Sequence, residues 1–177
     1  MDEHKAGLDA TGQPGAAGEG PVAKDAGDLE EALAFFQSRL FEKPGRYGLE
    51  YLTLKRGYAR DEIEGMGLGF FPQRQEVKIA LGEERFESLG FETIKEFGQT
   101  HKIIIPCRDA DGRLHGFIAR RIDSNRPKYI YSAHVDRGAL FNLHAVTNGS
   151  AVYVTEGYFD ALIATQRGIA GVVATGF

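Results

Sequence analysis

The chain has 177 residues, of which 42% are hydrophobic and 26% are charged, and its formal net charge is −4. This composition is typical of a globular protein, its apolar runs are much shorter than the roughly 20 residues of a membrane-spanning helix, and its acidic N-terminus is unlike a secretory signal. The single cysteine, Cys107, excludes a disulfide framework and a multi-cysteine zinc site, so we expect a soluble, cytoplasmic protein with no membrane partner.

The composition changes along the chain and predicts four segments. Residues 1–27 are rich in Gly, Ala, Asp and Glu, and we expect a disordered tail or a linker from an upstream domain. Residues 28–100 are expected to form a helical N-terminal subdomain, residues 101–149 a basic hairpin and sheet segment, and residues 150–177 the start of a further domain.

Helical periodicity dominates the segment that follows the tail. Apolar residues recur at helical spacing from Leu29 to Leu40, and Asp28 is placed to cap this helix. Two further helical stripes cover residues 47–56 and 59–64. The sequence therefore predicts several small helices before the first clear strand.

Strand signals begin near residue 102. Residues 102–107 and 113–120 are apolar runs that flank Asp109-Ala110-Asp111-Gly112, and Asp-Gly between two such runs predicts a β-hairpin. Residues 128–131 predict a third short strand. Cys107 ends the first of these strands, and we expect a buried thiol there rather than a nucleophile.

The last part of the chain has the pattern of a parallel strand–helix–strand unit. Residues 151–155 and 169–174 are nearly continuous apolar runs, and residues 158–167 between them predict a helix. Such runs are typical of parallel strands that are covered on both faces. Together with the preceding hairpin, this predicts an α/β protein of mixed type, with a small helical subdomain followed by a mixed sheet.

Two carboxylates stand at the start of this last helix. Glu156 follows a predicted buried strand, Gly157 allows close approach of a ligand, and Asp160 lies about one helical turn further on. Paired carboxylates at a strand end suit a divalent metal such as Mg²⁺. The alternative is structural, in which Glu156 only favours the positive end of the helix.

A basic stretch with interleaved aromatic residues covers residues 102–137. It holds eight Lys or Arg residues against four Asp residues, and Phe117, Tyr129 and Tyr131 lie among them. Cations beside rings that can stack are typical of a single-strand or nucleotide groove. The alternative is a solvated sheet face, because Arg120 and Arg121 point to opposite sides of a strand and cannot both line one groove.

A series of short blocks, in this order and spacing, resembles the catalytic core of bacterial-type DNA primases, which enters the TOPRIM fold shared with topoisomerases. The blocks are Arg56 to Ile63, Leu68 to Pro72, Ile105-Pro106, Asp109 to Gly112, Gly116-Phe117 with Arg120, Lys128-Tyr129, Arg137 to Phe141, Glu156 to Asp160, and Gly168-Ile169. The resemblance covers about residues 29–177. It implies that the chain is truncated inside the TOPRIM domain, since the second metal motif of the family would fall after Phe177.

The resemblance also implies roles for individual residues. Glu156 would be catalytic and would bind the metal, Mg²⁺ or Mn²⁺, with Asp160 as a supporting ligand. The residues expected to bind nucleic acid or nucleotide are Arg120, Lys128, Tyr129 and Arg137. Single-stranded DNA, ribonucleoside triphosphates and a replicative helicase would be the partners.

The function implied is template-directed synthesis of RNA primers in DNA replication by metal-dependent nucleotidyl transfer. The parent protein would then be a DNA-directed RNA polymerase, and we expect the 177-residue chain alone to be inactive. Two alternatives stay open: a non-catalytic TOPRIM relative of a mobile element that binds single-stranded nucleic acid, and a TOPRIM nuclease.

Overall fold

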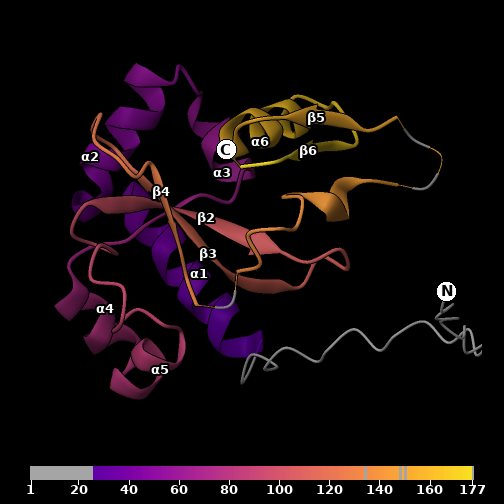
Figure 1. Ribbon diagram of the computed structural model, residues 1–177. Coiled ribbons are helices and arrows are strands. Elements are labelled where there is room, and N and C mark those ends of the chain that lie inside the picture. Colours follow the sequence, from indigo (N-terminus) through magenta and orange to yellow (C-terminus); the bar gives the residue numbers. More distant parts are fainter. Residues whose placement is uncertain (1–25, 134, 148, 150, 177) are drawn as a thin grey trace, which may run out of the picture.

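A computed structural model describes residues 26–133, 135–147, 149 and 151–176 of the chain (Figure 1). The expected tail, residues 1–27, therefore lies outside the described residues except for its last two, which already belong to the first helix. Within the described ranges, none of the helices combines the length and the apolar character needed to cross a bilayer.

The centre of the molecule is an antiparallel sheet of four strands in the order β1-β2-β3-β4. The strands are β1 (Gly69–Phe70), β2 (His101–Arg108), β3 (Leu114–Arg121) and β4 (Tyr129–Tyr131). The predicted hairpin joins β2 to β3. The Asp109 carboxylate accepts hydrogen bonds from the backbone N–H groups of Asp111 and Arg113, both at 2.9 Å, which holds the turn.

Helix α1 (Ala26–Phe41) packs against this sheet and begins two residues earlier than the sequence indicates. Asp28 therefore does not cap the helix. Its carboxylate lies in the first turn, where it favours the positive helix end, and forms an ion pair with Arg85 at 2.7 Å. The buried face of α1 carries Phe36, whose ring stacks on Phe71 with 5.0 Å between the ring centroids.

The remaining helices of the first half surround the sheet (Figure 1). They are the short 3₁₀ turn η1 (Lys43–Gly45), α2 (Arg46–Glu50), the π-helix η2 (Tyr51–Lys55), α3 (Arg60–Gly65), α4 (Arg74–Leu81) and α5 (Glu83–Ser88). The sheet separates two hydrophobic clusters. Ile104 of β2 faces the cluster that holds α1, and its neighbours Ile103 and Ile105 face the other one, as the period of a strand requires.

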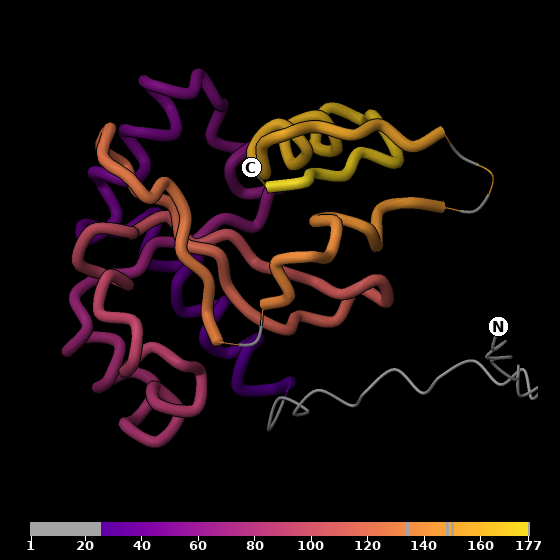
Figure 2. The backbone as a smooth tube through the Cα atoms, in the orientation of Figure 1, coloured from indigo at the N-terminus to yellow at the C-terminus, as the bar shows by residue number. Residues whose placement is uncertain are grey.

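The predicted parallel unit consists of β5 (Tyr153–Thr155), α6 (Tyr158–Gln166) and β6 (Val172–Ala174). The mixed α/β class is thus confirmed, and the antiparallel and parallel strands lie in two separate sheets. Figure 2 shows that the segment between β4 and β5 runs beside the β2–β3 hairpin before the chain enters this unit. This segment contains the short 3₁₀ turn η3 (Leu143–Ala145). The unit also contacts α3, because Arg167 pairs with Glu62 at 2.8 Å.

The prediction that both parallel strands are covered on both faces is wrong for β5. Its residues Tyr153 and Val154 are 55% and 63% exposed, whereas all of β6 is buried. The two strands also differ in pairing, since β6 has a neighbour on each side: β5 on one, and on the other Phe141, which exchanges two backbone hydrogen bonds with Ala174 at 2.9 and 3.1 Å. The open edge is therefore β5.

Candidate nucleic-acid interface

Two arginines lie over tyrosine rings around β4. Arg120 of β3 and Tyr129 of β4 are partners in the strand ladder, and the Arg120 guanidinium lies 4.8 Å from the centre of the Tyr129 ring. The guanidinium of Arg137 lies 4.7 Å from the centre of the Tyr131 ring. Such stacking holds each cation in place and leaves N–H groups for a phosphate.

The neighbouring arginine of β3 does not share this face, as the sequence predicts. Arg121 forms an ion pair with Asp123. The expectation that Phe117 belongs to the stacking rings is wrong, because Phe117 is fully buried in the cluster around α1. A fully buried ring makes no contact with a ligand.

Tyr51 joins this face to the π-helix. Its hydroxyl oxygen accepts hydrogen bonds from the Nε–H groups of Arg56, at 3.0 Å, and of Arg120, at 3.3 Å. Arg56 also lies over the ring of Phe159 in α6, 5.0 Å from its centre. One tyrosine thus positions two guanidinium groups that come from distant parts of the chain.

Tyr158, the first residue of α6, connects the face to the parallel unit. Its ring meets the Tyr129 ring edge to face at 4.9 Å, and its hydroxyl group lies 3.0 Å from that of Tyr131. Burial raises the pKa of Tyr158, and burial likewise raises the pKa of Tyr129, against the opposing effect of Arg120 and Arg56. Both phenols are therefore neutral at physiological pH, and the buried Tyr158 ring supports the partly exposed Tyr129 ring from below.

The two candidate metal ligands lie at this same helix start. Glu156 is exposed, and its backbone oxygen accepts a hydrogen bond from Gly176 N–H at 3.0 Å. The Asp160 carboxylate turns back over Gly157, since a Cβ atom added there would stand 2.6 Å from Asp160 Oδ2. Burial raises the pKa of Tyr58 and is the largest influence on it. The charge of Arg56 lowers this pKa, and the charge of Asp160 helps to raise it.

The carboxylates of Glu156 and Asp160 do not by themselves make a complete metal site. Throughout the described ranges, no group of three or more His, Cys, Asp or Glu residues is arranged to hold a metal ion. Two carboxylates are the number of protein ligands that Mg²⁺ commonly takes when phosphates and water complete its shell. The donor set thus fits a cation that arrives with a phosphate rather than a closed metal cage.

The six predicted site residues divide into three places. Arg120, Tyr129 and Arg137 gather around β4, and Glu156 and Asp160 lie at the start of α6. Lys128 is exposed just before β4, where it lines an open hollow of about 540 Å³ together with Arg126, Pro127, Tyr129 and Tyr131.

Sequence reasoning missed Tyr51 and Arg56. Arg56 begins one of the blocks quoted for the resemblance, which is a signal that could have marked it. Tyr51 carries no such signal, because its partner Arg120 is 69 residues away along the chain.

A family model for the N-terminal domain of the DNA primase catalytic core matches residues 35–145. The chain belongs to this family. The predicted resemblance to primases is confirmed, while the proposed continuation as a TOPRIM domain stays a prediction.

Primases from several bacteria are similar to the chain over most of its length. The DNA primase of Mycoplasma pneumoniae is 32% identical over 86% of the chain, and that of Geobacillus stearothermophilus is 26% identical over 86%. The chain covers 29% and 30% of these two proteins, so it spans less than a third of each relative.

Solved primase structures share the fold. A DnaG primase catalytic domain bound to single-stranded DNA superposes with a TM-score of 0.67 at 26% identity, over 85% of this chain and 52% of that one. The Aquifex aeolicus primase with its zinc-binding and RNA polymerase domains gives a TM-score of 0.65 at 27% identity, over 84% of this chain and 40% of that one.

Proposed function

We propose that the chain is the N-terminal part of a primase catalytic core, which binds a single-stranded DNA template while RNA primers are made on it. The observation that carries this proposal is the pairing of Arg120 with Tyr129 and of Arg137 with Tyr131, beside the start of α6, which Glu156 precedes and which holds Asp160 in its first turn. Stacked guanidinium groups can donate to phosphates, and neighbouring rings can stack on bases.

The carboxylates would supply the catalytic half of the site. Glu156 and Asp160 would hold a divalent cation, Mg²⁺ or Mn²⁺, which when bound neutralises the charge of a ribonucleoside triphosphate. Arg120 and Arg137, with the tyrosine rings beneath them, form an arginine face. This face would orient the template and the triphosphate relative to that cation, and orientation is a large part of catalysis in such reactions.

The proposal extends to the organisation of the protein. Residues 28–100 would form the helical subdomain, residues 101–149 the basic sheet segment, and residues 150–177 the first half of a TOPRIM domain whose later strands add further metal ligands. Ribonucleoside triphosphates and a replicative helicase would be partners in the cytoplasm, where replication takes place.

The test is primer synthesis by the full-length parent protein with Glu156 replaced. We expect Glu156→Gln to abolish template-dependent ribonucleotide incorporation and to leave the melting temperature nearly unchanged, because Glu156 is exposed and fills no core position. Glu84→Gln, at an exposed position of α5, is the matched control and should retain synthesis.

The same assay separates the alternatives. Cleavage of the template without incorporation would assign the protein to the TOPRIM nucleases. Binding without either reaction in the unchanged protein would assign it to the non-catalytic relatives. Incorporation at an unreduced rate by Glu156→Gln would remove Glu156 from the site.

A further inference from the structure

Tyr47 is an aromatic side chain that the candidate interface does not use. It lies in α2, and 65% of its surface is exposed. Two separate hollows meet at this residue, because it lines both of them. An exposed ring at such a junction is able to stack on a base.

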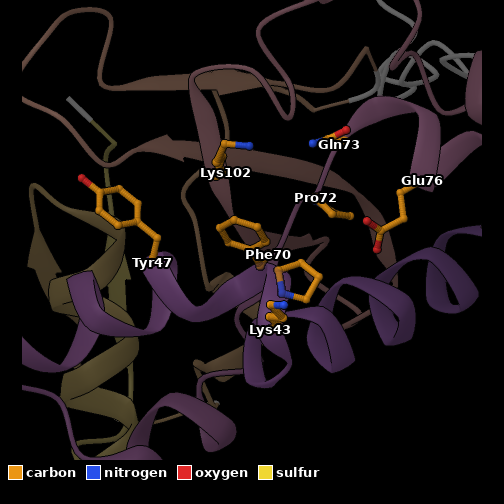
Figure 3. Close-up of a pocket in the computed structure, with 8 residues that line it drawn as sticks. Lys43, Tyr47, Phe70, Pro72, Gln73, Glu76 and Lys102 are labelled. Carbon is orange, nitrogen blue, oxygen red and sulfur yellow. The ribbon is translucent and has the colours of Figure 1, made fainter.

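The first hollow has a volume of about 500 Å³ and lies between α2, β1 and α4. Figure 3 shows Tyr47 at one end, Glu76 at the other and the Phe70 ring between them. Two lysines, Lys43 and Lys102, border this hollow, and the Lys102 amine lies 5.5 Å from the centre of the Phe70 ring.

The second hollow has a volume of about 390 Å³ and extends from Tyr47 along the π-helix. It is bordered by Tyr51, Leu54, Lys55 and Arg120. Arg120 is also the residue that stacks on Tyr129, so this hollow is continuous with the arginine face around β4.

The charges around the two hollows favour an anion. The three acids that line them are each paired: Glu50 with Arg46 at 3.0 Å, Glu76 with Arg39 at 3.1 Å, and Asp123 with Arg121. The four cations that line them are Lys43, Lys55, Lys102 and Arg120. In the part of the chain that the structure describes, none of these four forms an ion pair with a carboxylate. The partly buried Lys102 amine donates to the backbone oxygen of Gly98 at 2.5 Å and keeps two further N–H groups for a phosphate.

We infer that a single-stranded DNA continues from the arginine face across α2, with a base stacked on Tyr47 and its phosphates held between Lys55 on one side and Lys43 and Lys102 on the other. This inference rests on the proposed function, since it extends the template path that the function requires. Phosphate contacts would add affinity without sequence preference, and the ring would accept any base.

The test is binding of a dT oligonucleotide of about 16 nucleotides, long enough for a single-strand groove, that carries one 2-aminopurine, to the 177-residue chain. We expect Tyr47→Ala to weaken binding about tenfold and to remove the fluorescence quenching that a stacked base shows. Tyr47→Trp should restore both. The salt dependence should not change in either variant, because no charge is altered.

The charge variants give the complementary result. The double variant Lys43→Gln, Lys55→Gln should lower the log–log salt slope by about 1.4, because each phosphate contact with a single strand contributes about 0.7. Ile79→Ala, at a position of α4 that is 76% exposed, is the matched control for loss of an exposed apolar side chain and should bind as the unchanged chain does.

Three outcomes would overturn the inference. Unchanged affinity of Tyr47→Ala, together with weaker binding of Arg120→Glu, would keep the proposed interface and end the path before α2. Unchanged affinity of both variants would contradict the proposed function as well. Tighter binding of a U-containing RNA oligonucleotide than of the DNA would assign Tyr47 to the product strand instead of the template.

Discussion

Single tyrosines decide how the candidate interface is assembled. Tyr51 accepts hydrogen bonds from two arginines, Tyr129 carries Arg120 on its ring, and Tyr158 contacts the ring of Tyr129. Each of these rings lies on a different element, so the guanidinium groups are held by side chains rather than by backbone regularity. A position that looks like a core aromatic in the sequence thus serves to orient a cation.

Cys107 shows the opposite case, in which burial makes a reactive group inert. Its sulfur lies 3.8 Å from His115 Nε2, a separation that would suit a nucleophile and its base. Burial, however, raises the pKa of the Cys107 thiol to about 12, so the thiolate that would react is scarce at neutral pH. The sequence prediction of a buried, structural cysteine is confirmed.

We expect this raised pKa to make stability depend on pH in the alkaline range. Above about pH 9 the unfolded chain loses the thiol proton while the folded chain keeps it, so the free energy of unfolding falls as pH rises towards 12. At about pH 10.5 the titration of this thiol lowers the free energy of unfolding by about 2 kcal/mol. Urea unfolding of the chain and of Cys107→Ala, at pH 7 and at about pH 10.5, measures this fall in the free energy of unfolding.

Cys107→Ala is the control, because it should lack this part of the decline. Equal pH dependence in the two proteins would show that the folded thiol titrates normally. Alkylation by iodoacetamide at neutral pH should also be slow in the folded chain and fast in urea.

At the scale of elements, the close contact between α1 and β1 fixes the sheet. A Cβ atom added to Gly69 would lie 2.7 Å from Phe36 Cβ and 2.9 Å from the Phe36 backbone carbon. Real side chains do not approach so closely, so glycine is required where the edge strand crosses the helix.

We expect Gly69→Ala to destabilise the chain by about 1–3 kcal/mol, because α1 must move away from the sheet. Gly138→Ala is the control, since the nearest atom to its added Cβ is a side-chain oxygen of Asp136 at 3.3 Å. Urea unfolding followed by circular dichroism measures both. Equal stability of the two variants would mean that α1 and β1 separate at little cost.

The two parallel strands should respond differently to the same substitution. Val154 of β5 is 63% exposed, whereas Val173 of β6 is fully buried. We expect Val154→Lys to change the free energy of unfolding by no more than about 0.5 kcal/mol and to raise solubility, because a charge on an exposed apolar edge prevents strand pairing between molecules.

Val173→Lys is the matched comparison and should unfold the parallel unit, because it buries an unpaired charge. Solubility is measured by light scattering against concentration, and stability by urea unfolding. If Val154→Lys were the more damaging change, β5 rather than β6 would be the interior strand.

At the scale of the molecule, the parallel unit is held to the rest of the chain by side chains as well as by the backbone pairing of Phe141 with Ala174. Arg167 pairs with Glu62 of α3, and the amide of Asn142 donates to the backbone oxygen of Val172 at 2.8 Å. Tyr158, which lies between Glu156 and Asp160 in the sequence, contacts the Tyr129 ring over which Arg120 lies. In the proposed metal site the carboxylates of Glu156 and Asp160 would be the ligands from the described residues, and phosphate, water or further residues would supply the others.

We therefore expect the 177-residue chain to bind Mg²⁺ only in the millimolar range, because a hard cation needs about six oxygens. Isothermal titration calorimetry measures this affinity, and a priming assay on the same protein should give no product. Glu156→Gln should weaken even this binding. Micromolar affinity would show that the chain holds a more complete set of ligands than the pair identified.

The sequence by itself determined the local structure of this protein. Alternating and continuous apolar runs located strands β2 to β6, the Asp-Gly turn specified the hairpin, and strand pleating separated Arg120 from Arg121. These features depend on neighbours in the chain, so they can be read from short windows. The family blocks were recognised in the same way, and Arg56 was present in one of them without an assigned role.

Only the tertiary structure decided which residues meet. The contact between Tyr51 and Arg120 spans 69 residues, and that between Glu62 and Arg167 spans 105. It also decided that β5 rather than β6 is the open edge, since the backbone of Phe141 occupies the far side of β6. Long-range packing selects such partners because burial of rings and pairing of buried backbone groups depend on the whole fold, and a local sequence pattern carries neither.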